Sequence, residues 1–191
     1  NSVEGINRIF SMAMNIHVMF TIVIVIVLET VGIWFVNNVL NIPETRMFAA
    51  NVVFQFSTAT FCINMLRIPF NAVIFSHERM SVYAIMSITE AVLKLTLVFI
   101  LVCWTNDKLI IYAVLIFIVT LIINIIYVVY CKKHFSEVCH YKLCKDKGLF
   151  KKMTSFLGWN MVGGVTSIAT TEGPNYLINI YLGVSVNAAL G

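Results

Sequence analysis

Long apolar segments dominate the chain and alternate with short polar stretches. A helix that crosses a bilayer needs about 20 apolar residues. Runs of this length predict four spanning helices, at residues 16–40, 46–67, 81–104 and 109–130. Asparagines and Pro43 are expected to end the first, and Pro69 is expected to bend or end the second, because proline cannot donate the backbone hydrogen bond that continues a helix.

A fifth span, predicted at residues 149–183, has a different composition. Several residues are expected to break it: Gly158, Gly163, Gly164, Gly173 and Pro174. Polar residues recur along it at helical spacing and form one face: Asn160, Ser167, Thr171, Asn175 and Asn179. An interrupted helix with one polar face is typical of a transporter helix that borders a water-filled cavity.

The composition supports a membrane protein. The chain has 191 residues, of which 60% are hydrophobic and 12% are charged, and a soluble domain would carry about 25% charged residues. Its five cysteines are an odd number and do not form a disulfide framework. Because the chain starts without Met and shows no signal peptide, we interpret it as an internal fragment of an all-α integral membrane protein.

Basic residues gather on one side of the predicted spans. This side holds Arg8, Arg67, Arg79 and a lysine-rich connector at residues 132–152, whereas the other side holds Arg46 and Lys108. Short cytoplasmic loops are enriched in Lys and Arg, so we expect the connector to face the cytosol. Its seven lysines could also bind anionic lipid head groups, although topology alone accounts for them.

Charged residues inside the predicted spans are the strongest functional signal, because a charge in hydrocarbon needs a partner, a proton or water. Glu90 precedes Lys94 by one helical turn, so these two side chains are expected to pair. Glu29, Glu90 and Glu172 are candidate acids for coupling to protons or sodium ions. The alternative is structural, with an ion pair for Glu90, a protonated and hydrogen-bonded Glu29, and an aqueous mouth beside Glu172.

Amide side chains add to this polar set. Asn51 and Gln55 recur at helical spacing with Thr58 and Cys62, which makes one face of the second span polar. Together with the charged residues, they predict a substrate cavity. Its predicted lining is Asn51, Gln55, Glu90, Lys94, Asn160, Glu172, Asn175 and Asn179.

Other kinds of site find little support in the sequence. The connector region holds Cys131, His134, Cys139, His140 and Cys144, but their spacing matches no zinc knuckle and the surrounding lysines oppose a dication. No nucleophile–base pair, phosphate loop or dinucleotide signature is present. We therefore predict no metal site, no cofactor, no enzymatic activity and no nucleic-acid partner.

Two stretches resemble a known family. Residues 67–80, Arg-Ile-Pro-Phe-Asn-Ala-Val-Ile-Phe-Ser-His-Glu-Arg-Met, resemble a Pro-aromatic-Asn-Ala motif followed by His-Glu-basic-Met. This pattern is found in bacterial polysaccharide flippases of the multidrug/oligosaccharidyl-lipid/polysaccharide exporter superfamily. Gly158-Trp159-Asn160 and the glycines, asparagines and alanines that follow, to Ala189, are similar to the helix that opens the second half of those proteins.

The resemblance implies twelve to fourteen helices in two lobes. Residues 1–131 would then be the second part of the N-terminal lobe, residues 132–149 the cytoplasmic connector between lobes, and residues 150–191 the first helix of the C-terminal lobe. The implied function is the movement of an undecaprenyl-diphosphate-linked oligosaccharide from the inner to the outer leaflet of the bacterial cytoplasmic membrane by alternating access. Arg67 and Arg79 are candidate contacts for the diphosphate.

The sequence departs from the family pattern near its end. Leu190 replaces a common Arg, Val184 replaces a Pro, and Glu172-Gly-Pro174 replaces a Gln-Gly-apolar run. Two alternatives therefore accompany the flippase prediction. One is a cation-coupled multidrug exporter of the same superfamily, and the other is a non-transporting membrane remnant in which polar stripes only hold helices together.

Overall fold

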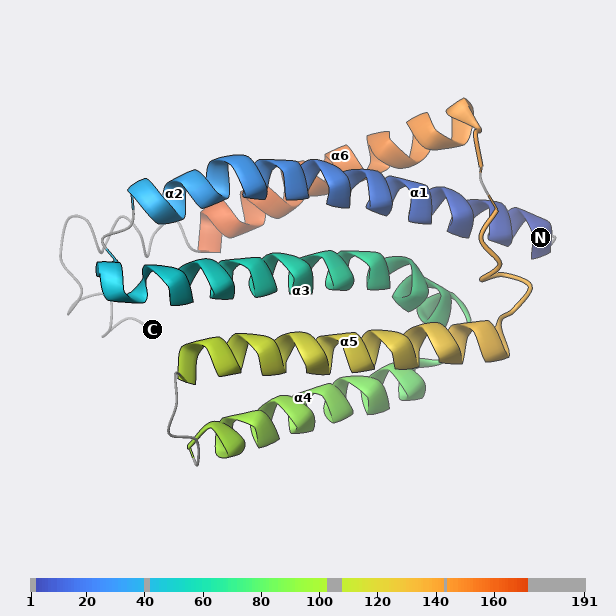
Figure 1. Cartoon of the computed structure of the whole chain (residues 1–191). Coiled ribbons are helices and arrows are strands. Elements are labelled where there is room, and N and C mark those ends of the chain that lie inside the picture. Colours follow the sequence, from blue (N-terminus) through green and yellow to red (C-terminus); the bar gives the residue numbers. More distant parts are fainter. Residues whose placement is uncertain (1–2, 40–41, 103–107, 143, 172–191) are drawn as a thin grey trace. The chain divides into compact units, whose positions relative to one another are not determined.

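The computed structural model describes residues 3–39, 42–102, 108–142 and 144–171, and every regular element among them is helical (Figure 1). The elements are α1 (Val3–Val27), the π-helical turn η1 (Leu28–Gly32), α2 (Ile33–Asn38), α3 (Glu44–Ser76), α4 (Met80–Val102), α5 (Lys108–His134) and α6 (Lys147–Thr171). The chain divides into two compact units, Asn1–Lys145 and Asp146–Gly191.

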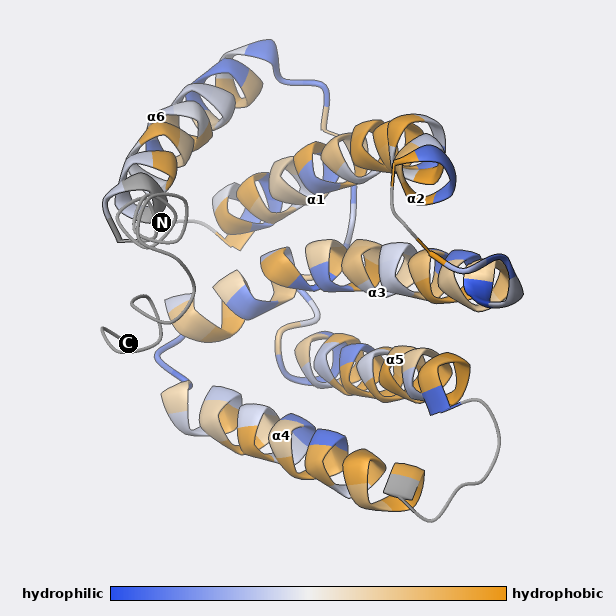
Figure 2. Cartoon of the chain, turned by 90° about the vertical axis from the view of Figure 1, so that its left-hand side faces the viewer, coloured by the Kyte–Doolittle hydropathy of each residue, from blue (hydrophilic) through white to orange (hydrophobic). Residues whose placement is uncertain are grey.

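Four helices in the described chain are long and apolar enough to cross a membrane. They are the continuous helix Val3–Asn38, of 36 residues, and three further helices, Glu44–Ser76, Met80–Leu101 and Lys108–His134. The structure thus supports a multi-pass membrane protein. Many large apolar side chains point outward, such as Phe99 at 66% exposure, as lipid-facing helices require. Figure 2 shows how strongly apolar residues dominate these helices.

The fifth predicted span is not among these four helices. The described helix α6 contains Gly158, Gly163 and Gly164 without interruption, so the prediction that these glycines break the helix is wrong. Glycine lowers helix stability by about 1 kcal/mol relative to alanine but keeps its backbone hydrogen bond. Residues 172–183 of the predicted span lie outside the described residues.

Helix α3 passes through Pro69 and continues to Ser76. Proline removes the hydrogen bond to the carbonyl of Met65, four residues earlier, and Figure 1 shows the helix bending in its last turns. Burial of Phe70, Val73 and Ile74 after the proline favours continuation. Of the two predicted outcomes, a bend or an end, the structure shows the bend.

The core of the first unit forms where α3 lies beside α5. The Phe56 and Phe117 rings are 5.5 Å apart, and the Cys131 thiol lies 3.7 Å from the carbonyl oxygen of Phe70. From the first of these contacts to the second, the residue number increases on both helices, so α3 and α5 run parallel. Helix α4 also packs against α5, in the opposite direction (Figure 1).

The connector after α5 is shorter than predicted, because Lys132 and Lys133 belong to α5 and Lys147 begins α6. Its backbone is held by the first turns of α1. The Asn7 amide nitrogen donates to the carbonyls of residues 137, 138 and 140 at 3.2, 2.8 and 2.6 Å. Ser11 and Asn15, each one turn further, also bond the connector. The first helix therefore starts at Val3, well before the predicted residue 16.

Candidate functional site

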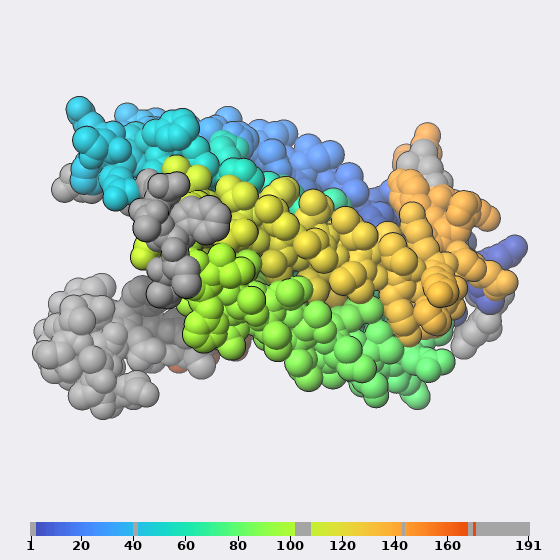
Figure 3. All heavy atoms as spheres, turned by 60° about the horizontal axis from the view of Figure 1, so that its bottom comes forward, coloured from blue at the N-terminus to red at the C-terminus, as the bar shows by residue number. Residues whose placement is uncertain are grey.

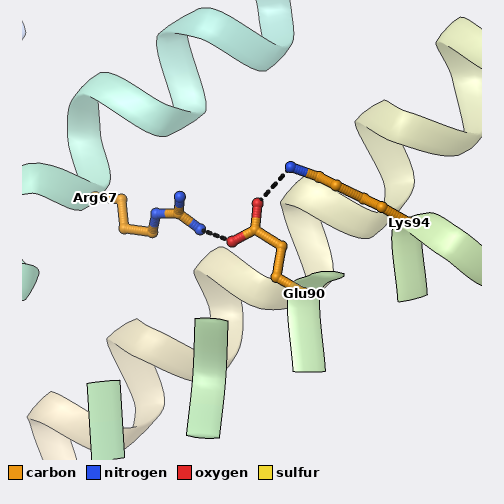
Figure 4. Close-up of polar contacts among 3 residues, drawn as sticks. All are labelled: Arg67, Glu90 and Lys94. Carbon is orange, nitrogen blue, oxygen red and sulfur yellow. Dashed lines mark hydrogen bonds and ion pairs between the residues drawn. The ribbon is translucent and has the colours of Figure 1, made fainter. Parts of the chain in front are cut away.

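Three charged side chains meet where α3 faces α4. The Glu90 carboxylate accepts a hydrogen bond from Arg67 Nη1 at 2.8 Å and another from Lys94 Nζ at 2.6 Å (Figure 4). The side chains of Arg67 and Glu90 are 16% and 15% exposed, and that of Lys94 is 41% exposed. The predicted ion pair between Glu90 and Lys94 is confirmed, and Arg67 completes a charged triad.

The sequence predicts that Arg67 ends a span at residues 46–67. In the structure Arg67 lies well inside α3, which continues to Ser76. Its guanidinium carbon is 5.2 Å from the centre of the Tyr127 ring on α5. An aromatic face and a carboxylate both stabilise a guanidinium, and this lowers the cost of placing its charge within a membrane helix. Arg67 therefore no longer counts among the loop residues that indicate orientation. Without it, the connector side still has more Lys and Arg residues than the other side.

The triad has a formal charge of +1, since one carboxylate faces two cations. Arg67 is shielded by its two partners, whereas the Lys94 ammonium is the more accessible cation. An excess positive charge inside membrane-spanning helices attracts an anionic group, because low-dielectric surroundings screen it weakly. The triad can thus bind phosphate or carboxylate through Lys94 while Arg67 and Glu90 remain paired.

Several buried polar atoms on α3 and α5 have no hydrogen-bond partner among the described residues. They are Asn64 Oδ1, Asn71 Oδ1, Thr120 Oγ1 and Asn124 Oδ1. Because α3 and α5 run parallel with partners about 61 positions apart, Asn64 lies level with Asn124, one turn before Arg67. Asn64 and Asn71 are not among the polar residues that the sequence pattern predicts to line a site. Their spacing of three and four residues from Arg67 was the available signal.

Asn51 and Gln55 form a second polar cluster, on another face of α3. Asn51 and Asn37 exchange two amide hydrogen bonds, of 3.2 and 2.9 Å, and Gln55 Nε2 donates to Glu29 Oε2 at 3.1 Å. Both predicted cavity residues thus contact the first helix rather than Glu90 and Lys94. The described helices place Asn51 and Gln55 in one cluster and Glu90 and Lys94 in another. A cavity that these four residues share therefore stays a prediction.

The π-helical turn explains why Glu29 and Asn37 face the same helix. Eight residues apart in a regular α-helix, they would point about 80° apart. The wide turn at Leu28–Gly32, closed by a hydrogen bond from Ile33 N–H to the Leu28 carbonyl, absorbs one extra residue and realigns them. Gly32 allows the close approach, since a Cβ atom there would lie 2.6 Å from the Phe54 ring.

The remaining predicted site residues do not join these clusters in the described structure. Arg79 lies exposed in the turn between α3 and α4, beside Glu78, which has a positive φ of 56°. Asn160 is exposed on α6 in the second unit, and its amide donates to the Phe156 carbonyl at 2.8 Å. Glu172, Asn175 and Asn179 lie outside the described residues.

The predicted Cys/His cluster is divided between the end of α5, which holds Cys131 and His134, and the connector, which holds Cys139, His140 and Cys144. A hydrogen bond from Cys131 and the charge of Lys132 hold the pKa of the Cys139 thiol below its usual value, against the opposing effect of burial. Within residues 3–39, 42–102, 108–142 and 144–171, no three His, Cys, Asp or Glu side chains are arranged to hold a metal ion.

Comparison of the chain with protein-family models, curated proteins and solved structures finds no match.

Proposed function

We propose that this chain is part of a bacterial flippase that moves an undecaprenyl-diphosphate-linked oligosaccharide across the cytoplasmic membrane. The observation that carries the proposal is the charged triad of Arg67, Glu90 and Lys94 within membrane-spanning helices, with its excess positive charge. A diphosphate crossing about 30 Å of hydrocarbon needs such a counter-charge. The sequence motifs at residues 67–80 and 158–160 support the same family.

In this mechanism, Lys94 contacts the diphosphate while the Arg67–Glu90 pair holds α3 and α4 in register. Unpartnered amide oxygens near the triad, those of Asn64 and Asn124, accept hydrogen bonds from water or from sugar hydroxyls. The lipid tail stays in the bilayer. Rocking of the two lobes exposes the site to each side in turn, as in other transporters built from paired lobes. Coupling to protons or sodium ions would supply the driving force.

The test uses the complete protein in a strain that depends on it for surface polysaccharide. Lys94→Gln removes the accessible cation and leaves Arg67 paired with Glu90, so we expect surface polysaccharide to fall at least about tenfold, the effect of about 1.4 kcal/mol. Lys94→Arg keeps the charge and should retain most of the activity. Lys108→Gln, at the start of α5, is the matched control and should change nothing.

Two outcomes would contradict the proposal. Full polysaccharide with Lys94→Gln would remove the triad from the transport step. Normal polysaccharide combined with lost dye efflux in Glu90→Gln would instead favour the cation-coupled exporter, with Glu90, Glu29 or Glu172 as the coupling acid.

A second candidate is a non-transporting membrane bundle. The paired amides Asn37 and Asn51 and the Glu29–Gln55 hydrogen bond favour it, because these polar side chains already satisfy each other between helices. A complete protein that moves neither oligosaccharide nor dye, yet stays folded in the membrane, would support this candidate.

A further inference from the structure

A hollow of about 240 Å³ opens between α4 and α5, which lie side by side (Figure 3). Its lining is apolar except for one threonine: Val82, Ile85, Met86, Thr89, Ile123 and Ile126. The Thr89 hydroxyl is occupied, since it donates to the Ile85 carbonyl at 2.8 Å. The hollow therefore offers no polar group to a ligand and suits a hydrocarbon chain. It lies on two helices that are long and apolar enough to cross a membrane.

The helix faces that line the hollow continue toward two exposed cations. On α5, Lys133 follows Ile126 by seven residues, which places both on one face. Tyr130 lies between them and stacks on His134, with ring centres 4.3 Å apart. Arg79 comes directly before α4, and its carbonyl accepts a hydrogen bond from the Val82 amide at 3.1 Å, so it lies at the end of the helix where the hollow's lining begins.

Both cations are available to a ligand. Arg79 and Lys133 are exposed and make no side-chain hydrogen bond or ion pair with another described residue. At about 1.5 Å rise per residue, Lys133 lies about 10 Å along α5 from Ile126, whereas Arg79 precedes Val82, the first lining residue of α4, by three residues. An acyl chain in the hollow would thus bring its glycerophosphate to the level of these cations.

We propose that the groove between α4 and α5 binds an anionic phospholipid, with one acyl chain in the hollow and the phosphate between Arg79 and Lys133. Three features along the same faces match the parts of such a lipid: an apolar hollow, an aromatic ring at the depth of the interface, and two cations. The lining of the hollow and its two cations share no residue with the triad. The inference does not depend on the flippase proposal.

The test is native mass spectrometry of the full chain released from nanodiscs that contain phosphatidylglycerol and phosphatidylcholine. The double variant Arg79→Gln/Lys133→Gln should lower the preference for phosphatidylglycerol about 25-fold, at about fivefold for each cation at the interface. Lys132→Gln, one residue from Lys133 but rotated by about 100°, is the matched control and should keep the preference.

A second pair of variants tests the hollow itself. Ile126→Trp should fill it and reduce retention of both lipids, whereas Ile122→Trp, at a position with similar exposure outside the hollow, should not. Equal lipid retention by the two tryptophan variants would overturn the proposal. An equal loss of phosphatidylglycerol preference with Lys132→Gln and with Lys133→Gln alone would also overturn it, in favour of a diffuse attraction of the lipid to basic residues. Displacement of phosphatidylglycerol by a polyprenyl phosphate at equal concentration would overturn the choice of phospholipid. Surface polysaccharide is a separate readout, so failure here leaves the flippase test intact.

Discussion

Arg67, Glu90 and Lys94 show how three charges can coexist in helices that suit a membrane. Each oxygen of the Glu90 carboxylate accepts from a different cation, and Tyr127 covers the guanidinium of Arg67. Charge-assisted hydrogen bonds of this kind are about twice as strong as neutral ones. Removing the shared carboxylate leaves two neighbouring cations that repel each other, so Glu90 is the residue on which the cluster depends.

We predict that Glu90→Gln lowers the free energy of unfolding by about 2 kcal/mol, the usual loss for a hydrogen bond to a charged group. Lys94→Gln should cost less, because the Lys94 side chain is 41% exposed and water replaces its partner. Thermal unfolding in detergent measures both. An equal or larger loss in Lys94→Gln would show that Glu90 is not the centre of the cluster.

The first helix illustrates what a single extra residue does to an element. The π-helical turn at Leu28–Gly32 lets Glu29 and Asn37 face α3 together, and each finds a partner there. π-Helical turns of this kind arise as one residue added to an α-helix and are frequent at functional sites. Removing that residue should restore a regular helix without moving either side chain off α3.

Deletion of Val31, which is 59% exposed, should therefore change the free energy of unfolding by less than about 1 kcal/mol, a surface-like effect. Deletion of Val23, 51% exposed in the regular part of α1, is the matched control. It should rotate the preceding residues by about 100° and separate Asn7 from the connector. Chemical denaturation compares the two, and equal losses would contradict this explanation of the turn.

Across the first unit, contacts distant in sequence join the start of the first helix to the connector that follows α5. Asn7 reaches backbone carbonyls about 130 residues later, and Tyr141 donates to Asn15 at 2.6 Å. The connector that leads to α6 is thereby held against α1.

Asn7→Ala should release the connector, because its amide supplies three of the hydrogen bonds. We expect a loss of about 1–2 kcal/mol and faster amide hydrogen exchange at residues 137–142. Asn38→Ala is the control, since the Asn38 amide donates to the Trp34 carbonyl within its own helix. Unchanged exchange in Asn7→Ala would mean that other contacts hold the connector.

Much of the architecture follows from local pattern. Apolar length alone predicts the four described helices that are long and apolar enough to cross a membrane, and the Glu90–Lys94 pair follows from spacing on one helix. These features depend on neighbours within a turn or on the length of a segment, and both can be read directly from the order of residues. The start of α1 at Val3 does not follow from apolar length, because its first turns carry the polar residues Asn7, Ser11 and Asn15, which bond to the distant connector.

Other features depend on how helices rotate and align against each other. The partner of Arg67 lies 23 residues away on α4, and Gln55 and Asn51 turn toward the first helix rather than toward Lys94. The two polar faces of α3 look alike in the sequence, since helical spacing shows which residues share a face but not which helix that face meets. The packing of α3 between the first helix and α5 determines which helix each polar face meets. Few rotations of α3 about its axis bury its apolar side chains against both neighbours at once.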